Sequence, residues 1–221
     1  DVYFSERGLF QVEIAGKVFI DMGTTAPALT AEITSYADGH GAACIDAPVS
    51  GGDVGARNAS LSIMAGGQAA VIDKVKPLFD CLGKVQHMGD EGSGQHTKMC
   101  NQITVAGTMI GVCEALIYAQ RAGLDAEKMI AVVSRGAAGC WTLDNLAPRM
   151  IRQDYAPGFM VDHFIKDLGI AIDEMKVMGL ELPGLSLAIK LYQKVSEIGH
   201  GTSGTQALIL ALQQCEDDAG C

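Results

Sequence analysis

The sequence predicts an α/β segment followed by an all-α segment, with one long helix joining them. Short β-type runs alternate with helical patterns up to about Gly89, which is typical of a sheet covered by helices. After Gly94 the sequence has no convincing strand pattern. Residues 95–122 carry apolar side chains at helical spacing, and at about 1.5 Å per residue such a helix is about 42 Å long. That length exceeds the needs of a small domain, so we expect this helix to run from the sheet domain through the helical domain.

The elements follow in order along the chain. Strands are expected at residues 18–22, 43–49, 61–65 and 84–88. A helix capped by Thr24 or Thr25, with Pro27 in its first turn, should reach about residue 39, and another should cover residues 69–79. Beyond the long helix, further helices are expected at residues 125–134, 141–150, 161–178, 183–198 and 202–214, before a frayed tail at 216–221. These patterns divide the chain into domains at residues 1–91 and 92–221.

Composition limits the classes of partner. The 221 residues carry a formal net charge of −10, which argues against nucleic acid or an anionic membrane as a partner. The longest apolar runs contain polar residues, so we expect no membrane span. Seven cysteines without a Cys-x-x-Cys pair favour a reducing compartment such as the cytoplasm, while the mitochondrial matrix or another organelle stays open. The five histidines are scattered, so we predict no metal.

Lys98 opens the long helix in a polar cluster. The Gly92-Ser93-Gly94 turn precedes it, and Gln102 follows one helical turn later with Asn101 beside it. Burying a cation and two amides is costly unless they have partners, so their clustering suggests a site. The plain alternative is a solvated first turn with a surface lysine, the commoner fate of a single lysine.

A second motif, Ser50-Gly51-Gly52, follows a short apolar run that reads as a buried strand. Glycines there expose successive backbone N–H groups, and such a concavity suits a carboxylate. The alternative is an ordinary glycine turn. The motif lacks the Gly-x-Ser-x-Gly frame of a hydrolase elbow, so Ser50 is not interpreted as a nucleophile.

Four motifs in this order resemble the β-hydroxyacid dehydrogenase family, which includes 3-hydroxyisobutyrate dehydrogenase and tartronate semialdehyde reductase. The motifs are Asp21-Met22-Gly23-Thr24-Thr25-Ala26-Pro27, Asp46-Ala47-Pro48-Val49-Ser50-Gly51-Gly52, Gly92-x-Gly94-x-x-x-Lys98-x-x-Asn101-Gln102 and Phe164-Ile165-Lys166-Asp167-Leu168-Gly169. The resemblance covers residues 8 to about 212. It implies that residues 1–91 are the C-terminal part of a Rossmann-like NAD(P)-binding domain, followed by an interdomain helix and an all-α domain.

One family feature is missing from the sequence. Family members bind the dinucleotide pyrophosphate on a Gly-x-Gly-x-x-Gly turn after their first strand. Residues 92–97 lack the third glycine, and residues 51–55 are not followed closely by a helical pattern. We therefore expect the C-terminal part of a longer enzyme, which on its own binds NAD(P) weakly and is inactive.

The resemblance implies roles for individual residues. Lys98 is the general acid/base, Asn101 and Gln102 orient the substrate, and Ser50, Gly51 and Gly52 bind its carboxylate. Thr24 and Lys166 fall where the family contacts the cofactor, NAD or NADP, and Phe159 is expected to pack near the nicotinamide. A free lysine titrates near pH 10.4, so catalysis near neutrality implies a pKa lowered by desolvation or by a second cation, for which Lys166 is the candidate. The family commonly has Asn-Asn where this chain has Asn101-Gln102, so either residue can carry the catalytic amide.

Other residues have two interpretations each. Lys166 could be an exposed helix lysine, and Asp167 is expected to pair locally or to support the fold. Trp141 could line the substrate pocket or lie in the helical core. Arg149 could meet a second substrate charge or cap a helix.

The function predicted from these residues is NAD(P)-dependent interconversion of a small 3-hydroxyacid and its semialdehyde. The partners expected are a small carboxylate substrate and, by family analogy, further copies of the chain in a dimer or tetramer. Two alternatives stay open: a non-catalytic helical dimerisation module, and a 6-phosphogluconate dehydrogenase-like enzyme. The latter is disfavoured because a His is expected directly before the catalytic Asn, where this chain has Cys100. The sequence does not choose between NAD and NADP or among short acids.

Overall fold

The computed structural model describes residues 1–217 and divides into two compact units. The first unit comprises residues 1–100, and the second begins at Asn101. Helix α4 (Ser93–Arg121) contributes its first two turns to the first unit and the rest of its length to the second. Each unit is described by itself.

The first unit is built around a five-stranded mixed sheet. Strands β1 and β2 pair in parallel, β2 and β3 both pair antiparallel with β4, and β4 pairs in parallel with β5. Ile63 of β4 is paired with both Val49 and Val85, so β3 and β5 lie on opposite edges of β4. The elements are η1 (Leu9–Gln11), β1 (Val18–Asp21), α1 (Pro27–Gly39), β2 (Ala43–Asp46), β3 (Val49–Ser50), α2 (Gly52–Arg57), β4 (Leu61–Gly66), α3 (Ala69–Asp80) and β5 (Gly83–Gly89). This partial Rossmann-like sheet confirms the predicted fold class.

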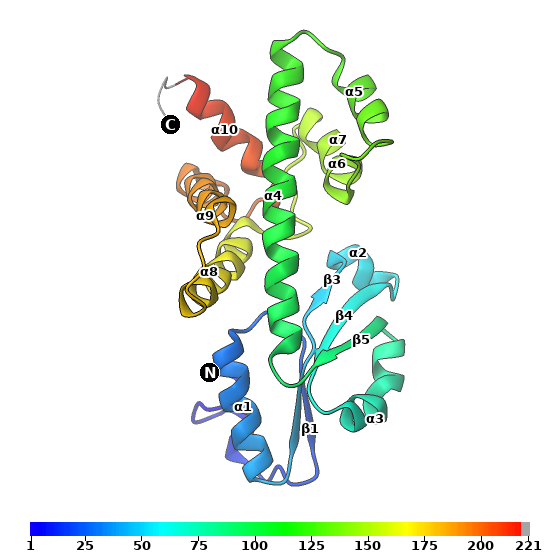
Figure 1. Ribbon diagram of the computed structural model, residues 1–221, viewed down its shortest axis with the longest axis vertical. Helices are drawn as coiled ribbons and strands as arrows, with labels where there is room; N and C mark the ends of the chain where they lie inside the picture. Colours follow the sequence, from blue (N-terminus) through cyan, green and yellow to red (C-terminus); the bar gives the residue numbers. More distant parts are fainter. Residues whose placement is uncertain (218–221) are drawn as a thin grey trace. The chain divides into compact units, whose positions relative to one another are not determined.

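Alternate side chains of the strands serve two separate cores. Ile20 and Ile45 pack with Phe79 of α3, whereas the intervening Phe19 and Cys44 pack with Ile33 of α1. Successive strand residues point to opposite faces, so α1 and α3 must cover opposite faces of the sheet. Figure 1 shows the two helices on either side of the strands.

Three predictions for the first unit were wrong in detail. The strand expected at residues 43–49 is two strands, because strand pairing is interrupted at Ala47 and Pro48. Proline has no N–H group to donate to a strand ladder. A short helix, α2, begins at Gly52, where no helical pattern was expected, since two of its six residues are glycines. Helix α1 has Ala26 rather than a threonine at its N-cap, with Pro27 at its first position as predicted.

The regular elements of the second unit, within the residues described, are all helical. They are α5 (Ala126–Val133), α6 (Trp141–Asn145), α7 (Ala147–Ile151), α8 (Val161–Val177), α9 (Pro183–Val195), η2 (Ser196–His200), η3 (Thr205–Ala207) and α10 (Leu208–Asp217). In Figure 1, α5–α7 lie on one side of α4, and α8–α10 on the other. Phe164 of α8 and Tyr192 of α9 meet edge to face at 4.8 Å between ring centroids, and both are fully buried.

Three helical predictions in the second unit merged or misplaced elements. Residues 141–150 form two short helices that meet at Leu146, two residues before Pro148. The helix expected to reach residue 198 continues as a π-type turn in which Gly199 has φ +90°. The segment 202–214 starts as a 3-10 turn before α10, which reaches Asp217, so the predicted tail begins too early and its last four residues lie outside the part described.

Helix α4 passes a test of length and composition for membrane spans, contrary to the expectation that its polar residues would prevent this. In the apolar 18-residue stretch of this helix, 44% is buried within the protein. Core helices of soluble proteins pass the same test.

Candidate active site

Lys98 is anchored on the glycine loop within the first unit. Its side chain is only 8% exposed, and Nζ donates a hydrogen bond to the carbonyl oxygen of Val49 at 2.9 Å. Val49 directly precedes Ser50-Gly51-Gly52 in the chain. The structure therefore brings the side chain of the predicted acid/base residue next to the predicted carboxylate-binding loop. It excludes the alternative interpretation of Lys98 as a solvated surface lysine.

The loop itself requires glycine. Gly51 has φ +131° and Gly52 has φ +61°, conformations that L side chains rarely adopt. A Cβ on Gly51 would also lie 3.2 Å from Cδ2 of Leu61. Both glycines are exposed, while Ser50 is half-buried in β3 and paired with Ser62 of β4. A backbone surface without side chains thus stands beside the residue that Lys98 contacts.

Asp46 fixes the start of α4. Its carboxylate, 2% exposed, accepts the backbone N–H groups of Gly92 at 2.8 Å and of Gln95 at 2.9 Å. These donors have no partner inside a helix, and a negative charge is favourable at a helix N-terminus. Gly94 allows the close approach, because a Cβ there would overlap the backbone oxygens of Met64 and Asp46. The end of β2 therefore sets where Lys98 emerges.

Gln95 joins the same helix turn to the loop after β1. Its side chain is fully buried; Oε1 accepts the Thr25 N–H, and Nε2 donates to the Gly23 carbonyl oxygen, both at 3.0 Å. Asp21, the last residue of β1, accepts the Gly23 N–H and the Thr25 hydroxyl. The predicted cofactor contact Thr24 lies between the two residues that Gln95 holds.

The second unit contains a chain of polar side chains on α4 and α8. Asn101 Nδ2 donates to Gln102 Oε1 at 2.7 Å, and Gln102 Nε2 donates to Asp167 Oδ2 at 2.7 Å. Lys166 Nζ pairs with Asp167 Oδ1 at 2.9 Å. Gln102 and Asp167 are 3% and 2% exposed, whereas the Lys166 side chain is 54% exposed. The structure brings these predicted residues together, and Asp167 does pair locally.

Two aromatic candidates from the sequence, Trp141 and Phe159, differ in how far they are exposed. Trp141 is 65% exposed, so the second of its two interpretations, burial in the helical core, is wrong. Phe159 is 37% exposed and lies 5.8 Å from the Phe164 ring, centroid to centroid.

Arg149 lies at the end of α7 and pairs with a carboxylate in the segment that follows. Its guanidinium binds both carboxylate oxygens of Asp154, at 2.8 and 3.1 Å. The hydrogen bonds from Arg149, followed by the one from the Ala156 N–H, lower the pKa of Asp154 to about 2. These bonds tie α7 to the segment after it, and the predicted contact of Arg149 with a substrate charge stays a prediction.

Sequence reasoning gave no role to Asp46 or Gln95 and only a supporting one to Asp167. Asp46 and Gln95 stand inside two of the four motifs, so the signal was present. Their partners lie 46 to 72 residues away in the chain, and no local spacing reveals such contacts.

Comparisons with known proteins cover both units. The family model described as the NAD-binding domain of NADP-dependent 3-hydroxyisobutyrate dehydrogenase matches residues 92–212. The model described as the NAD binding domain of 6-phosphogluconate dehydrogenase matches residues 1–105. The two matches overlap in the first turns of α4, which carry Lys98 and Gln102.

Individual relatives agree with the family models. An uncharacterized oxidoreductase, YkwC of Bacillus subtilis, is 48% identical over 94% of this chain and 73% of its own length. The probable 3-hydroxyisobutyrate dehydrogenase-like 1 of Arabidopsis thaliana is 50% identical over 90% of this chain, which spans 60% of that relative. The solved 3-hydroxyisobutyrate dehydrogenase of Mycobacterium tuberculosis, with L-serine, is 31% identical with a TM-score of 0.84, over 93% of this chain and 73% of that one.

Proposed function

We propose, on the premise that this chain belongs to the β-hydroxyacid dehydrogenase family of 3-hydroxyisobutyrate dehydrogenases and related reductases, that the complete protein interconverts a small 3-hydroxyacid and its semialdehyde. The family is one of NAD(P)-dependent dehydrogenases and reductases. The observation that carries the proposal is the hydrogen bond from Lys98 Nζ to the Val49 carbonyl, because it places a buried lysine beside the loop that we propose to bind the carboxylate.

Lys98 is the proton carrier in this proposal. Oxidation of a C–OH group removes a hydride from carbon and a proton from oxygen, and bound NAD or NADP supplies the hydride acceptor. A neutral amine can donate one N–H to Val49 and still offer its lone pair to the substrate hydroxyl proton. In reduction the ammonium returns that proton to the new alkoxide oxygen. Lys98 is only 8% exposed, and this burial limits the access of competing water to the transfer.

Ser50, Gly51 and Gly52 hold the substrate carboxylate through main-chain donors. The left-handed glycine conformations leave the backbone uncovered, so that an anion can approach it closely. Lys98 adds a positive charge beside the loop when protonated. The loop thus selects for small acids and places the hydroxyl carbon near Nζ.

Asn101 is the substrate amide, and Gln102 is the residue that positions it. Gln102 is buried, and its oxygen and nitrogen are bound to Asn101 and Asp167. Asn101 is half-buried and lies three residues after Lys98 on α4, on the same side of the helix. This division of labour accommodates Gln where the family commonly has a second Asn.

The residues of the first unit fit a dinucleotide at one edge of the sheet. The parallel strands β1 and β2 end in register at Asp21 and Asp46, and ligands of open α/β sheets bind outside the carboxyl ends of such strands. Thr24 follows β1 at this edge. Thr24 is the residue of the first unit that we propose to contact NAD or NADP, and Lys166 and Phe159 are the candidates in the second unit.

Turnover of the complete native chain tests the proposal. The assay follows NADH and NADPH absorbance with a panel of short 3-hydroxyacids and semialdehydes, each paired with its methyl ester. We expect hydride transfer with at least one acid and a fall in kcat/KM of about 100-fold for the matching ester, which cannot form charged hydrogen bonds with the loop. Absence of turnover across the panel, or equal turnover of acid and ester, would contradict it.

A further inference from the structure

Gln95 has a fully buried polar side chain that links two parts of the first unit. One is the start of α4, which carries the proposed acid/base residue, and the other is the loop after β1, which carries the proposed cofactor contact. Gln95 stands on α4, three residues before Lys98, and so about 4.5 Å along the helix axis from it. Its amide binds the loop that carries Thr24. The catalytic helix and the cofactor loop are thus joined by one side chain.

The amide grips the main chain on both sides of one residue. Oε1 accepts the N–H of Thr25, and Nε2 donates to the carbonyl oxygen of Gly23. Both groups belong to residues next to Thr24, so the backbone of Thr24 cannot rotate without breaking one of these bonds. A planar amide has one acceptor and one donor side, which matches these two groups and no other arrangement of them.

The backbone of Gln95 is held by a hydrogen bond, as its side-chain amide is. Its backbone N–H donates to Asp46 Oδ2, whose other oxygen accepts the Gly92 N–H. Asp21 holds the far side of the loop through the Gly23 N–H and the Thr25 hydroxyl. The loop is therefore tied to the last residues of both parallel strands and to the first turn of α4.

We propose that Gln95 is a positioning residue, which keeps the cofactor contact at Thr24 in constant register with the acid/base group Lys98. This inference rests on the proposed function. Hydride transfer requires cofactor, substrate and acid/base to be held close and aligned, and small displacements cost rate. Gly23 is exposed and Thr25 only half-buried, so loss of the amide frees a loop that water can then solvate. The effect falls on position more than on folding.

The test replaces Gln95 with Leu, which has a similar volume and no hydrogen-bonding groups. Gln206→Leu is the matched control, because Gln206 is also buried, at 1% exposure, and its amide also makes two hydrogen bonds to the main chain. In Gln206 the amide nitrogen donates both of them, to the carbonyl oxygens of Asp154 and Ala156. The measurements on the complete enzyme are thermal unfolding, the Kd and KM of the cofactor, the KM of the acid substrate, kcat, and hydrogen exchange of the Thr25 amide.

For Gln95→Leu we expect a cofactor Kd and KM raised about tenfold, a kcat lowered several-fold, an unchanged KM for the acid and faster exchange at Thr25. Gln206→Leu should lose comparable thermal stability and change none of the kinetic values. Gln95→Glu is the milder second variant: it keeps an acceptor for Thr25 but turns a second acceptor towards the Gly23 carbonyl. It should raise the cofactor Kd as well, and it serves if the Leu variant does not fold.

The outcomes separate this inference from the function it rests on. A Gln95→Leu enzyme with lowered stability but unchanged cofactor Kd, cofactor KM and kcat overturns the positioning role and leaves the proposed function intact. A wild-type protein that binds neither NADPH nor NADH in a fluorescence titration overturns both.

Discussion

Nζ of Lys98 lies 2.9 Å from the carbonyl oxygen of Val49, the residue just before the glycine loop. This hydrogen bond spans 49 residues of sequence and joins the second turn of α4 to the first residue of a two-residue strand. It directs the side chain of Lys98 towards the Ser50-Gly51-Gly52 loop. The proposed chemistry follows from this direction.

Asp167→Asn should impair catalysis without unfolding the protein. Asp167 is the charged acceptor that holds Gln102, and an Asn there can turn its own NH2 group towards the Gln102 amide nitrogen. We expect kcat to fall about ten- to hundredfold, because a misplaced Gln102 displaces Asn101. Steady-state kinetics of the complete enzyme measure this.

Asp173→Asn is the control for that change. Asp173 lies on the same helix, is 76% exposed and pairs only with Lys176 in a surface bridge. Such bridges contribute little, so its kinetics should match the wild type. If Asp167→Asn also kept kcat within twofold, the amide chain would have no part in catalysis.

The Arg149–Asp154 pair predicts a specific dependence of stability on pH. The pKa of Asp154 is lowered to about 2 by its hydrogen bonds from Arg149 and Ala156, against a usual value of about 3.8. A carboxyl group with a lowered folded-state pKa stabilises the fold above its unfolded-state pKa, and this stabilisation is lost as the pH falls through the folded-state value. The melting temperature of wild type should exceed that of Asp154→Asn at pH 7, and the difference should shrink from about pH 4 and vanish near pH 2.

Arg149→Met supplies the second comparison, since it removes the donor and leaves the carboxylate. In that background, Asp154→Asn should change the melting temperature by a much smaller and less pH-dependent amount. A wild-type advantage that grew towards acid would show that the pair does not set the pKa of Asp154.

Local patterns predicted the fold class and most elements, because each rests on short-range periodicity. The long helix was expected at residues 95–122 and is found at Ser93–Arg121. Failures came where proline or glycine divides one apolar run, as at Pro48 and Pro148, or where a six-residue helix contains two glycines. At the prolines the local backbone restriction decides, whereas the six-residue helix forms despite the low helix propensity of glycine.

The candidate site was only partly predictable, for a similar reason. Lys98, the glycine loop and the Asn101-Gln102 pair stand out in the sequence as unusual residues in motifs. Their supports do not: Asp46, Gln95 and Asp167 act through partners 46 to 72 residues away, and only the folded chain places them.

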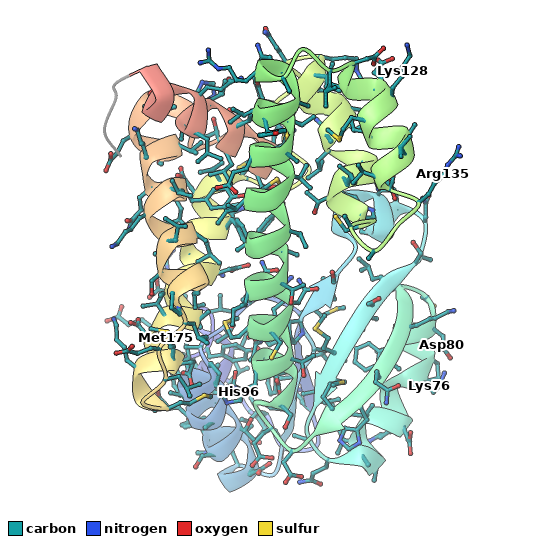
Figure 2. All side chains as sticks on the ribbon, turned by 45° about the horizontal axis from the view of Figure 1, so that its top comes forward. Lys76, Asp80, His96, Lys128, Arg135 and Met175 are labelled. Carbon is teal, nitrogen blue, oxygen red and sulfur yellow. The ribbon has the colours of Figure 1, made fainter. Side chains whose placement is uncertain are left out.

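An exposed surface lysine provides the control for substitution of the buried Lys98. Lys76 and Asp80 lie close together on the outside of α3 (Figure 2), where they form an i,i+4 bridge at 2.5 Å with about half of each side chain exposed. Lys76→Ala also removes a lysine amine, but one that lies on the exposed surface of α3 and pairs with Asp80. It should leave kcat within twofold of wild type.

The most direct measurement is the kcat of Lys98→Ala in the complete enzyme, taken with and without added ethylamine. We predict a loss of about 100-fold or more, partly restored by ethylamine in proportion to its free-base concentration, because a small amine can occupy the space left by the side chain and carry the proton. A Lys98→Ala enzyme with kcat within a few-fold of wild type, at any amine concentration, would contradict the account.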